Sequence, residues 1–161
     1  MEYNPYALTG KTILVTGASS GIGRAVAIEC SRLGAHVILS ARNKEKLEET
    51  LKMMEGHGHQ VIECDLSKEK EVSLLIDEVP EIQGLVNNAG TTMTVPVPFI
   101  KFNVLSDLLK VNTIAPIMIL SGLVKKKKLR ANSSVVFTSS VSGLGRVSPG
   151  NTMYAATKGA V

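Results

Sequence analysis

Several features that mark secreted, metal-binding or membrane proteins are missing from this sequence. It has no tryptophan and only two cysteines, Cys30 and Cys64, which are too few for a disulfide framework and lack the CxxC spacing of a metal site. No run of about 18 uninterrupted apolar residues occurs, so we expect no membrane span. Residues 1–5 show no basic stretch followed by an apolar one, as a secretory signal would. We therefore expect buried free thiols, no bound metal and a reducing, cytoplasmic setting.

The charge balance is mildly basic, with 18 lysines and arginines against 14 aspartates and glutamates, a net charge of +4. Such an excess can indicate a nucleic-acid partner. Here the run of lysines at 125–128, with Arg130 close by, supplies it, and no aromatic residue lies within the run. Lysines at the end of a helix complement the negative end of its dipole. We interpret the run as a solvated helix end and expect no nucleic-acid partner.

Apolar strand-like runs alternate with helix-like patterns along the whole chain. Its 161 residues, 44% of them hydrophobic, suffice for one domain with its own core. Strands are predicted at 11–16, 36–40, 61–64, 84–87 and 134–139. Helices are predicted at 20–33, 44–55, 68–79 and 99–124, with another beginning near Thr152. Ser67 is the expected cap of the third helix, and Pro116 is expected to kink or interrupt the fourth.

The predicted strands are apolar on both sides rather than alternating, which indicates a sheet covered on both faces. Strands that alternate with helices favour parallel pairing, because each helix carries the chain back across the sheet. We therefore expect an α/β fold in which a parallel sheet of five strands is flanked by helices. Residues 1–161 would form a single domain.

A glycine-rich turn, TGASSGIGR, follows the first predicted strand. Gly17 permits a tight turn, Gly21 lets a pyrophosphate approach the backbone, and Gly23 lets the following helix pack close to the strand. Backbone N–H groups at the start of a helix favour bound anions, and the hydroxyls of Ser19 and Ser20 can add donors. A plain turn between a strand and a helix needs only one glycine. Three glycines in seven residues therefore favour a nucleotide-binding turn.

The end of the second predicted strand carries information about the type of cofactor. A carboxylate about 20 positions beyond the glycines would bind the 2′-hydroxyl of an adenosine ribose and favour NAD. Here that position holds Ala41, followed by Arg42, whose guanidinium can bind a 2′-phosphate. We therefore prefer NADP(H) and keep NAD(H) as the alternative, since Arg42 could also be an ordinary surface arginine. Asp65, after the third strand, could accept a hydrogen bond from the adenine amino group or serve only as a turn residue.

Asn87, Asn88, Ala89 and Gly90 end the fourth predicted strand. In open α/β sheets, ligands bind beyond the carboxyl ends of the strands, near the point where the strand order reverses. The asparagine side chains can brace the neighbouring loop there, and the two small residues leave room for a ribose. Taken alone, the tetrapeptide is equally compatible with a simple turn.

Tyr154 and Lys158 are four residues apart, so a helix would place a phenol and an ammonium on one face. They follow the fifth predicted strand, whose end carries Ser139 and Ser140. A free tyrosine has a pKa near 10, too high for a base at neutral pH. An ammonium roughly 4 Å away would interact with the phenolate by about 4 kcal/mol at an effective dielectric constant of about 20. That interaction suffices to bring the phenol toward a working pH, which suits the interconversion of a carbonyl and an alcohol.

Two further side chains could take part in this chemistry. Ser140 would hold the substrate oxygen without changing charge. Asn112 lies in an apolar helical segment, where a lone amide needs a partner. It could order a water that relays protons to Lys158; the alternative is a satisfied buried asparagine without a catalytic role.

In this order along the chain, the motifs resemble those of the short-chain dehydrogenase/reductase family. The resemblance rests on 16–23, Asp65, 87–90, Asn112, Ser140, Tyr154 and Lys158 and covers nearly the whole chain. It implies a doubly wound, Rossmann-type sheet, an NAD(P)(H) cofactor and a catalytic tetrad of Asn112, Ser140, Tyr154 and Lys158. The residues predicted to bind the cofactor are Gly17, Ser19, Ser20, Gly21, Ile22, Gly23, Arg42, Asp65, Leu66, Asn88, Ala89, Gly90, Tyr154 and Lys158.

The chain departs from the family pattern in two ways. Ser140 lies 14 residues before Tyr154, one more than is usual, so Ser139 or Ser142 could instead supply the working hydroxyl. The chain also stops at Val161, well before the usual length of the family. We therefore expect the N-terminal part of a longer reductase, with a C-terminally incomplete sheet that ends at an apolar edge strand. The catalytic helix would be too short to be stable alone, so this piece by itself would be weakly active or inactive.

The expected function is hydride transfer between NADP(H) and a small-molecule carbonyl or alcohol, with Tyr154 as general acid or base. The resemblance also implies a homo-oligomer, a dimer or a tetramer, in the full-length protein. The alternative is a truncated, non-catalytic form. Such a form would bind nucleotide or associate with full-length subunits through the apolar helix at 114–124.

Overall fold

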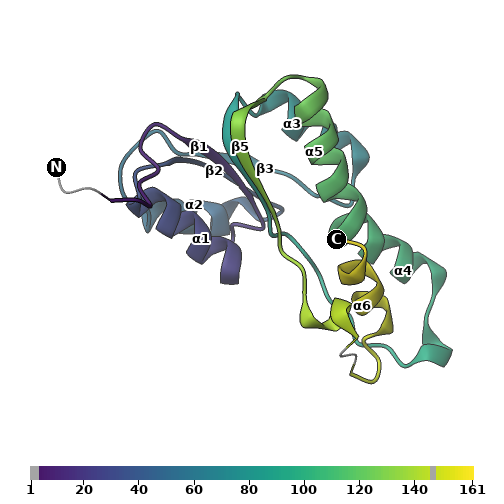
Figure 1. The fold of residues 1–161 in the computed structure, drawn as a ribbon. Helices are drawn as coiled ribbons and strands as arrows, with labels where there is room; N and C mark the ends of the chain where they lie inside the picture. The colour runs from purple at the N-terminus through teal and green to yellow at the C-terminus, as the bar shows by residue number, and fades with distance from the viewer. Residues whose placement is uncertain (1–3, 146–147) are drawn as a thin grey trace.

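The computed structural model describes residues 4–145 and 148–161, and its centre is a five-stranded parallel sheet (Figure 1). The strands are β1 (Thr12–Thr16), β2 (His36–Ala41), β3 (Gln60–Glu63), β4 (Ile82–Asn87) and β5 (Leu129–Phe137). Their order across the sheet is β3-β2-β1-β4-β5. β2 and β3 therefore lie on one side of β1, and β4 and β5 lie on the other. Every pairing is parallel, which confirms the predicted doubly wound α/β fold.

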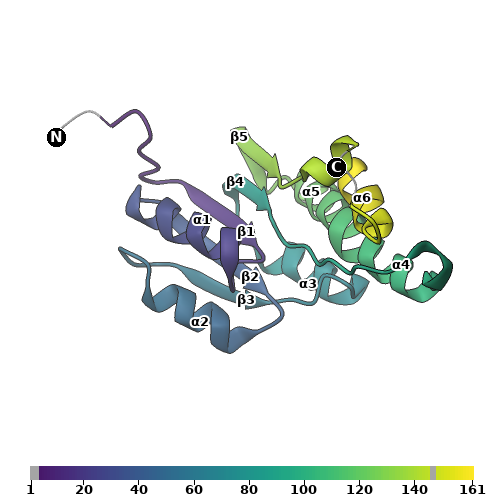
Figure 2. The same ribbon diagram turned by 90° about the horizontal axis from the view of Figure 1, so that it is seen from below.

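Helices cover both faces of the sheet (Figure 2). On one face lie α1 (Gly21–Arg32) and α2 (Lys44–Lys52), and on the other lie α3 (Glu69–Glu78) and α5 (Ala115–Lys125). Alternate residues of β1 supply the two cores, because successive side chains of a strand point to opposite faces. Ile13 and Val15 pack with α1 and α2, whereas Leu14 packs with α3 and α5. Burial of both faces explains why the central strands β1 and β2 are apolar throughout, whereas the edge strand β5 has no buried residue.

The predicted long helix is interrupted earlier than the sequence indicated. α4 (Phe102–Leu109) runs into a π-helical turn, η2 (Lys110–Ile114), which continues directly into α5. Pro116 is the second residue of α5, which directly follows this turn. A proline lacks the N–H that would bond to the carbonyl four residues earlier and its ring crowds that carbonyl, which here belongs to Asn112 in η2, so the interruption lies next to the proline that was expected to cause it. The irregularity is the wider turn that contains Asn112.

The continuous helical stretch Phe102–Lys125 is 24 residues long and, by length and composition alone, apolar enough to cross a membrane. Asp107 and Lys110 interrupt its apolar sequence, which is why no uninterrupted run was recognised. The core helix of a globular domain can have the same length and composition. Here 33% of the most apolar window is buried, and Ile119 and Leu123 are fully buried in the core beneath the sheet.

The beginning of α3 differs from the prediction. Lys68, and not Ser67, occupies the N-cap position, and no side chain caps the helix. Ser67 instead donates its backbone N–H and its hydroxyl to Oδ1 of Asp65, at 3.0 and 2.8 Å. The expected cap was wrong because the helix begins at Glu69, which places Ser67 one residue before the N-cap position, where its hydroxyl donates to Asp65 and accepts from no helix N–H.

β5 begins at Leu129, earlier than the predicted strand, and the structure shows why the pattern was hidden. The register between β5 and β4 shifts between Ile82 and Gly84. Asn132, within the shifted part, has a left-handed backbone with φ of 63°. A bulge of this kind breaks the regular strand periodicity, so the first half of β5 does not read as a strand.

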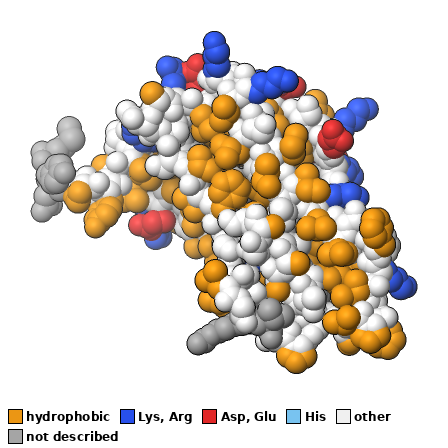
Figure 3. All heavy atoms as spheres, turned by 45° about the vertical axis from the view of Figure 1, so that its right-hand side comes forward, with side chains coloured by type: hydrophobic (Ala, Val, Ile, Leu, Met, Phe, Trp, Pro, Cys, Tyr) orange, Lys and Arg blue, Asp and Glu red, His pale blue; other side chains and the backbone are white. Residues whose placement is uncertain are grey.

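β5 lies at the edge of the sheet, and in the described part of the chain it pairs with β4 alone. Val135 and Val136 are 37% and 50% exposed there, as the predicted apolar edge requires. Further hydrophobic side chains gather on the face that carries α4 and α5 (Figure 3). The exposed ones on these helices and the turn between them are Phe102, Ile114, Ile117, Met118 and Val124.

Both cysteines are free thiols. Cys64 is buried, as expected, whereas Cys30 is only partly buried. Burial, with a smaller contribution from Glu71 and Asp65, raises the pKa of the Cys64 thiol to about 12. This thiol therefore stays protonated and unreactive at neutral pH.

Three short elements complete the fold beyond the carboxyl edge of the sheet. They are η1 (Val97–Phe99), η3 (Val141–Leu144) and α6 (Thr152–Gly159). α6 packs against η3 and also against α4 and η2 (Figure 1). The segments that follow β4 and β5 thus lie at the same edge of the sheet as the glycine-rich turn after β1.

Candidate active site

A cavity of about 700 Å³ opens at the carboxyl edge of the sheet. Its wall contains thirteen of the predicted site residues: Gly17, Ser19, Ser20, Ile22, Arg42, Asp65, Leu66, Asn88, Ala89, Gly90, Ser140, Tyr154 and Lys158. Residues that follow all five strands therefore meet in one place. Gly21, Gly23 and Asn112 do not line the cavity and lie in the turn or behind the wall.

The glycine-rich turn packs tightly against the end of β4. Gly17 has φ of +69°, and a Cβ there would lie 2.8 Å from Cα of Ala89. A Cβ on Gly23 would collide with the carbonyl oxygen of Gly17 and approach Nδ2 of Asn88 to 2.5 Å. Thr16 Oγ1 accepts hydrogen bonds of 3.1 Å from the backbone amides of Asn88 and Ala89. The absence of side chains at Gly17 and Gly23 is what allows this contact.

The other glycine of the turn has a different environment. Gly21 has φ of +54°, and a Cβ there would meet nothing within 4 Å. The next residue, Ile22, is 67% exposed and lines the cavity. The first turn of α1 therefore presents open backbone, with unpaired N–H groups, to the space where an anion would lie.

At one end of the cavity lie Arg42 and Asp65, which follow β2 and β3. Burial tends to raise the pKa of Asp65. Hydrogen bonds from Ser67 and the charges of Arg42 and Lys68 outweigh it and hold that pKa below its usual value. The Asp65 carboxylate is therefore ionised and able to accept hydrogen bonds at neutral pH.

At the other end lie Tyr154 and Lys158, both on α6. Lys158 is only 5% exposed, and its ammonium donates a hydrogen bond of 2.5 Å to the carbonyl oxygen of Thr138. Burial lowers the pKa of Lys158, because the charged ammonium is poorly solvated there. A Cβ on Gly90 would lie 3.5 Å from this ammonium, so the loop after β4 lies directly beside it.

The two serines after β5 have different hydrogen-bond partners. Ser139 donates its hydroxyl to the carbonyl oxygen of Lys158 at 2.9 Å, which ties the end of β5 to α6. Ser140 Oγ accepts a hydrogen bond of 3.2 Å from the backbone N–H of Ser142, and within residues 4–145 and 148–161 its hydroxyl donates to no protein acceptor. Ser142 lies in η3 and does not line the cavity.

Asn112 is almost fully buried in the π-helical turn, and its side-chain amide makes three hydrogen bonds to protein partners. Oδ1 accepts from the backbone N–H of Thr91 at 2.8 Å, and Nδ2 donates to the carbonyl oxygen of Thr91 at 2.8 Å and to Oγ1 of Thr157 at 3.0 Å. Such an arrangement braces the loop after β4 against α6. Both hydrogens of Nδ2 are used and Oδ1 keeps a second lone pair, so the side chain is satisfied within the protein and its role in ordering a water stays a prediction.

Sequence reasoning missed several residues of the cavity wall. They are Ala41, Asn43, Lys46, Cys64, Thr91, Thr92, Val111 and Thr138. Lys46 is the most informative, because it is a second basic residue of the wall, in the first turn of α2 and four residues after Arg42. The signal that could have found it is the basic residue in the first turn of the helix after β2, facing the same edge as the glycine-rich turn.

Comparisons with known proteins agree with this geometry. The family model for short chain dehydrogenases matches residues 11–161, which is almost all of the chain. The chain belongs to the short-chain dehydrogenase family. It is thus related to oxidoreductases, as the motifs indicated.

Three relatives show how broad the short-chain dehydrogenase family is. The 3-oxoacyl-(acyl-carrier-protein) reductase of Rickettsia felis is 34% identical, over 94% of this chain and 62% of the relative. The 3-ketodihydrosphingosine reductase of Mus musculus is 35% identical, over 98% of this chain and 50% of the relative. A tropinone reductase homolog of Arabidopsis thaliana is 36% identical, over 97% of this chain and 60% of the relative. This chain therefore spans about half to five-eighths of the length of these relatives.

Solved structures of short-chain dehydrogenases have the same fold. A short chain dehydrogenase from Escherichia coli CFT073, complexed with NADPH, superposes with a TM-score of 0.86 at 32% identity. The superposition covers 98% of this chain and 70% of that one. A betaketoacyl-ACP reductase superposes with a TM-score of 0.84 at 28% identity, over 95% of this chain and 63% of that one.

Proposed function

We propose that this short-chain dehydrogenase transfers hydride between NADP(H) and a small-molecule carbonyl or alcohol. The observation that carries the proposal is the composition of the cavity of about 700 Å³. Arg42 lies at one end of it, Tyr154, Lys158 and Ser140 lie at the other, and the glycine-rich turn lies between them. A dinucleotide is long and anionic, so it suits a cavity with an anion-binding turn in the middle and reactive side chains at one end.

The residues present fit a dinucleotide cofactor. Gly17 and Gly90 line the cavity without a side chain, and the first turn of α1, which begins at Gly21, offers free N–H groups to a pyrophosphate. Asp65 and Leu66 would hold the adenine. When bound, the nicotinamide would supply or accept the hydride at the substrate carbon.

Arg42 supports NADP(H) over NAD(H). It follows β2 at the position where a carboxylate would favour NAD, and its guanidinium suits a bidentate contact to a 2′-phosphate. The Escherichia coli relative complexed with NADPH supports the same preference. Asn88 and Ala89 would line the ribose of the cofactor.

The residues proposed to transfer and stabilise the proton lie on α6 and at the end of β5. Tyr154 would donate a proton to the substrate oxygen in reduction, or accept it in oxidation. Lys158 would stabilise the phenolate through its positive charge, and its partial desolvation strengthens that interaction. Ser140 would hold the substrate oxygen, because its hydroxyl hydrogen is not needed elsewhere, whereas that of Ser139 is. Asn112 would act by bracing α6.

The relatives with named substrates are reductases, which supports a carbonyl substrate for this protein. The exposed hydrophobic side chains on α4 and α5 support association of identical subunits, as a dimer or tetramer (Figure 3). We further propose a cytoplasmic setting, in line with two unpaired cysteines.

Turnover with a panel of carbonyl compounds, followed by loss of NADPH absorbance, tests this function. Tyr154→Phe should lower turnover by roughly a hundredfold or more while leaving NADPH binding intact, because only the transferable proton is removed. NADPH binding without turnover on any carbonyl would support the alternative, a non-catalytic form that binds nucleotide. A chain that binds no pyridine nucleotide would contradict both.

A further inference from the structure

The adenosine end of the cavity carries a second cation besides Arg42. Lys46, in the first turn of α2, lines the cavity together with Arg42, Asn43 and Ser19. Within residues 4–145 and 148–161, neither Lys46 nor Arg42 forms an ion pair with an acidic side chain. Their positive charges are therefore available to an anionic ligand. The Asp65 carboxylate lies near enough to interact electrostatically with Arg42.

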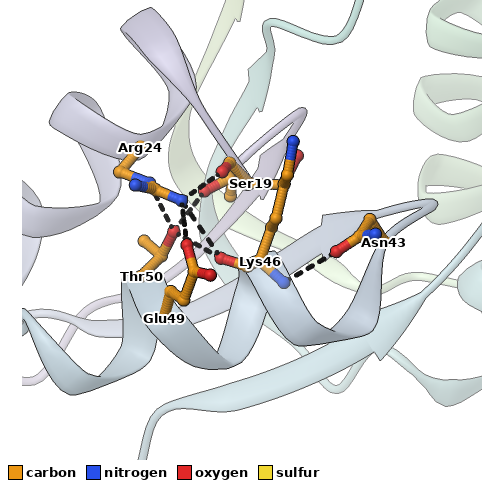
Figure 4. Close-up of polar contacts among 7 residues, drawn as sticks. Ser19, Arg24, Asn43, Lys46, Glu49 and Thr50 are labelled. Atoms are coloured by element: carbon orange, nitrogen blue, oxygen red, sulfur yellow. Dashed lines mark hydrogen bonds and ion pairs between the residues drawn. The ribbon is translucent and has the colours of Figure 1, made fainter.

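Arg24 of α1 latches the start of α2 to the glycine-rich turn (Figure 4). Its Nη2 lies 2.6 Å from the carbonyl oxygen of Ser19 and 3.4 Å from the carbonyl oxygen of Lys46, while Nε donates to Oγ1 of Thr50 at 3.0 Å. Nη2 also pairs with the carboxylate of Glu49 at 3.2 Å. One guanidinium thus joins the turn that would hold the phosphates to the helix that carries Lys46.

The latch also orients the backbone of the turn. Thr50 Oγ1 lies 3.0 Å from the carbonyl oxygen of Ala18, so the carbonyls of Ala18 and Ser19 both point toward α2. In a trans peptide the N–H of the following residue points the opposite way. The amides of Ser19 and Ser20 therefore point away from α2, and both residues line the cavity.

The same contacts leave the charge of Lys46 unopposed. Glu49, the acid one turn further along α2, is occupied by Arg24. Asn43 caps the helix by accepting from the backbone N–H of Lys46 at 2.7 Å, which fixes the first turn. The Lys46 side chain extends from α2 alongside Ser19 toward the turn (Figure 4).

We propose that Lys46 is a second determinant of cofactor specificity, and that it binds the adenosine 2′-phosphate together with Arg42 while Arg24 sets its position. This inference rests on the proposed preference for NADP(H). A phosphate monoester carries between one and two negative charges and several acceptor oxygens, so two cations can bind it at once. NAD(H) lacks this group and makes no use of Lys46.

The test compares NADPH and NADH binding to the 161-residue chain by titrating the fluorescence of the reduced nicotinamide. Lys46→Gln removes the charge and keeps most of the side chain, and it should weaken NADPH binding about tenfold while NADH binding stays unchanged. The salt dependence of NADPH binding should become shallower. Lys44→Gln is the matched control, because Lys44 is exposed on the same helical turn and does not line the cavity. It should change neither affinity.

The Arg24 latch is tested in the same assay. Arg24→Lys keeps the charge but loses the planar fork, so it should reduce the ratio of NADPH to NADH affinity. In the Lys46→Gln background the same change should have little further effect on that ratio, because both residues act on one contact.

Three outcomes would overturn the inference. Equal NADPH affinity in wild type and Lys46→Gln would remove Lys46 from the phosphate site while the proposed function stands. An equal loss of affinity for NADPH and NADH in Lys46→Gln would mean that Lys46 only supports the fold. A wild-type chain that binds neither nucleotide would overturn the proposed function together with this inference.

Discussion

Asn112 Nδ2 donates a buried hydrogen bond of 3.0 Å to Thr157 Oγ1, and this contact joins the π-helical turn to the helix of Tyr154 and Lys158. The same Thr157 hydroxyl donates a hydrogen bond of 2.8 Å to the carbonyl oxygen of Tyr154, so Asn112 and Tyr154 share Thr157 as a partner. Thr113 completes the link by donating to the carbonyl oxygen of Thr157 at 3.0 Å. The short helix α6 is therefore held in place by side chains of η2.

Thr157→Val tests this link. The valine keeps the shape of the side chain but leaves Nδ2 of buried Asn112 without one of its acceptors, which costs about 1–3 kcal/mol of unfolding free energy. Urea denaturation measures the loss. Thr157→Ser, which keeps the hydroxyl, should recover most of it, and an equal loss in both variants would assign the effect to packing.

Substitution of Ser140 should affect turnover, whereas substitution of Ser139 should affect the free energy of unfolding. Ser140→Ala should lower turnover by roughly a hundredfold with little change in stability, because its hydroxyl is proposed to hold the substrate oxygen. Ser139→Ala should instead lower the unfolding free energy by about 1 kcal/mol, because it removes the 2.9 Å bond to Lys158. Steady-state kinetics and urea denaturation of both variants make the comparison. The reverse pattern would make Ser139 the working hydroxyl.

Gly23→Ala should be strongly destabilising, by roughly 3 kcal/mol, since the added methyl would collide with the backbone of Gly17 and with Asn88. Gly10→Ala is the comparison: its φ of +75° is unfavourable for alanine, whereas Gly23 lies in α1 and has no positive φ, but a Cβ at Gly10 meets nothing within 4 Å. It should cost only about 1 kcal/mol. Similar thermal unfolding midpoints for the two variants would contradict the close packing of the turn.

Because of Lys158, the free energy of unfolding should depend on pH in the alkaline range. Burial lowers its folded-state pKa below the ordinary value of 10.5, so between these two pKa values the unfolded chain binds more protons than the folded one. The contribution of Lys158 to stability is therefore least favourable at neutral pH and rises with pH through that window.

Denaturation of Tyr154→Phe with and without Lys158→Met across this pH range isolates the effect, because the phenol whose ionisation Lys158 is proposed to influence is absent from both proteins. The difference in unfolding free energy should move in favour of the protein that keeps Lys158 as the pH rises toward 10.5. A difference that moves in favour of the Lys158→Met protein would show that the ammonium is stabilised, rather than desolvated, in the folded protein.

The order of strands and helices could be predicted from the sequence because it depends on local patterns. Buried strands need apolar residues on both sides, and helices need apolar residues at helical spacing, so each element is recognisable within its own segment. The glycine-rich turn and the spacing of Tyr154 and Lys158 are local in the same sense. Boundaries set by distant partners could not be read this way, as the bulge at Asn132 in β5 illustrates.

By itself, the sequence determined the parallel α/β architecture and the edge of the sheet at which the site lies. Tertiary structure alone decided which polar groups of that site are free. In the described part of the chain, the Ser139 hydroxyl donates to Lys158 while that of Ser140 donates to no protein acceptor, Asn112 bonds to Thr91 and Thr157, and Lys46 forms no ion pair while Arg24 pairs with Glu49. The physical reason is that each of these hydrogen bonds or ion pairs joins segments from different elements, and chain packing alone brings them within bonding distance.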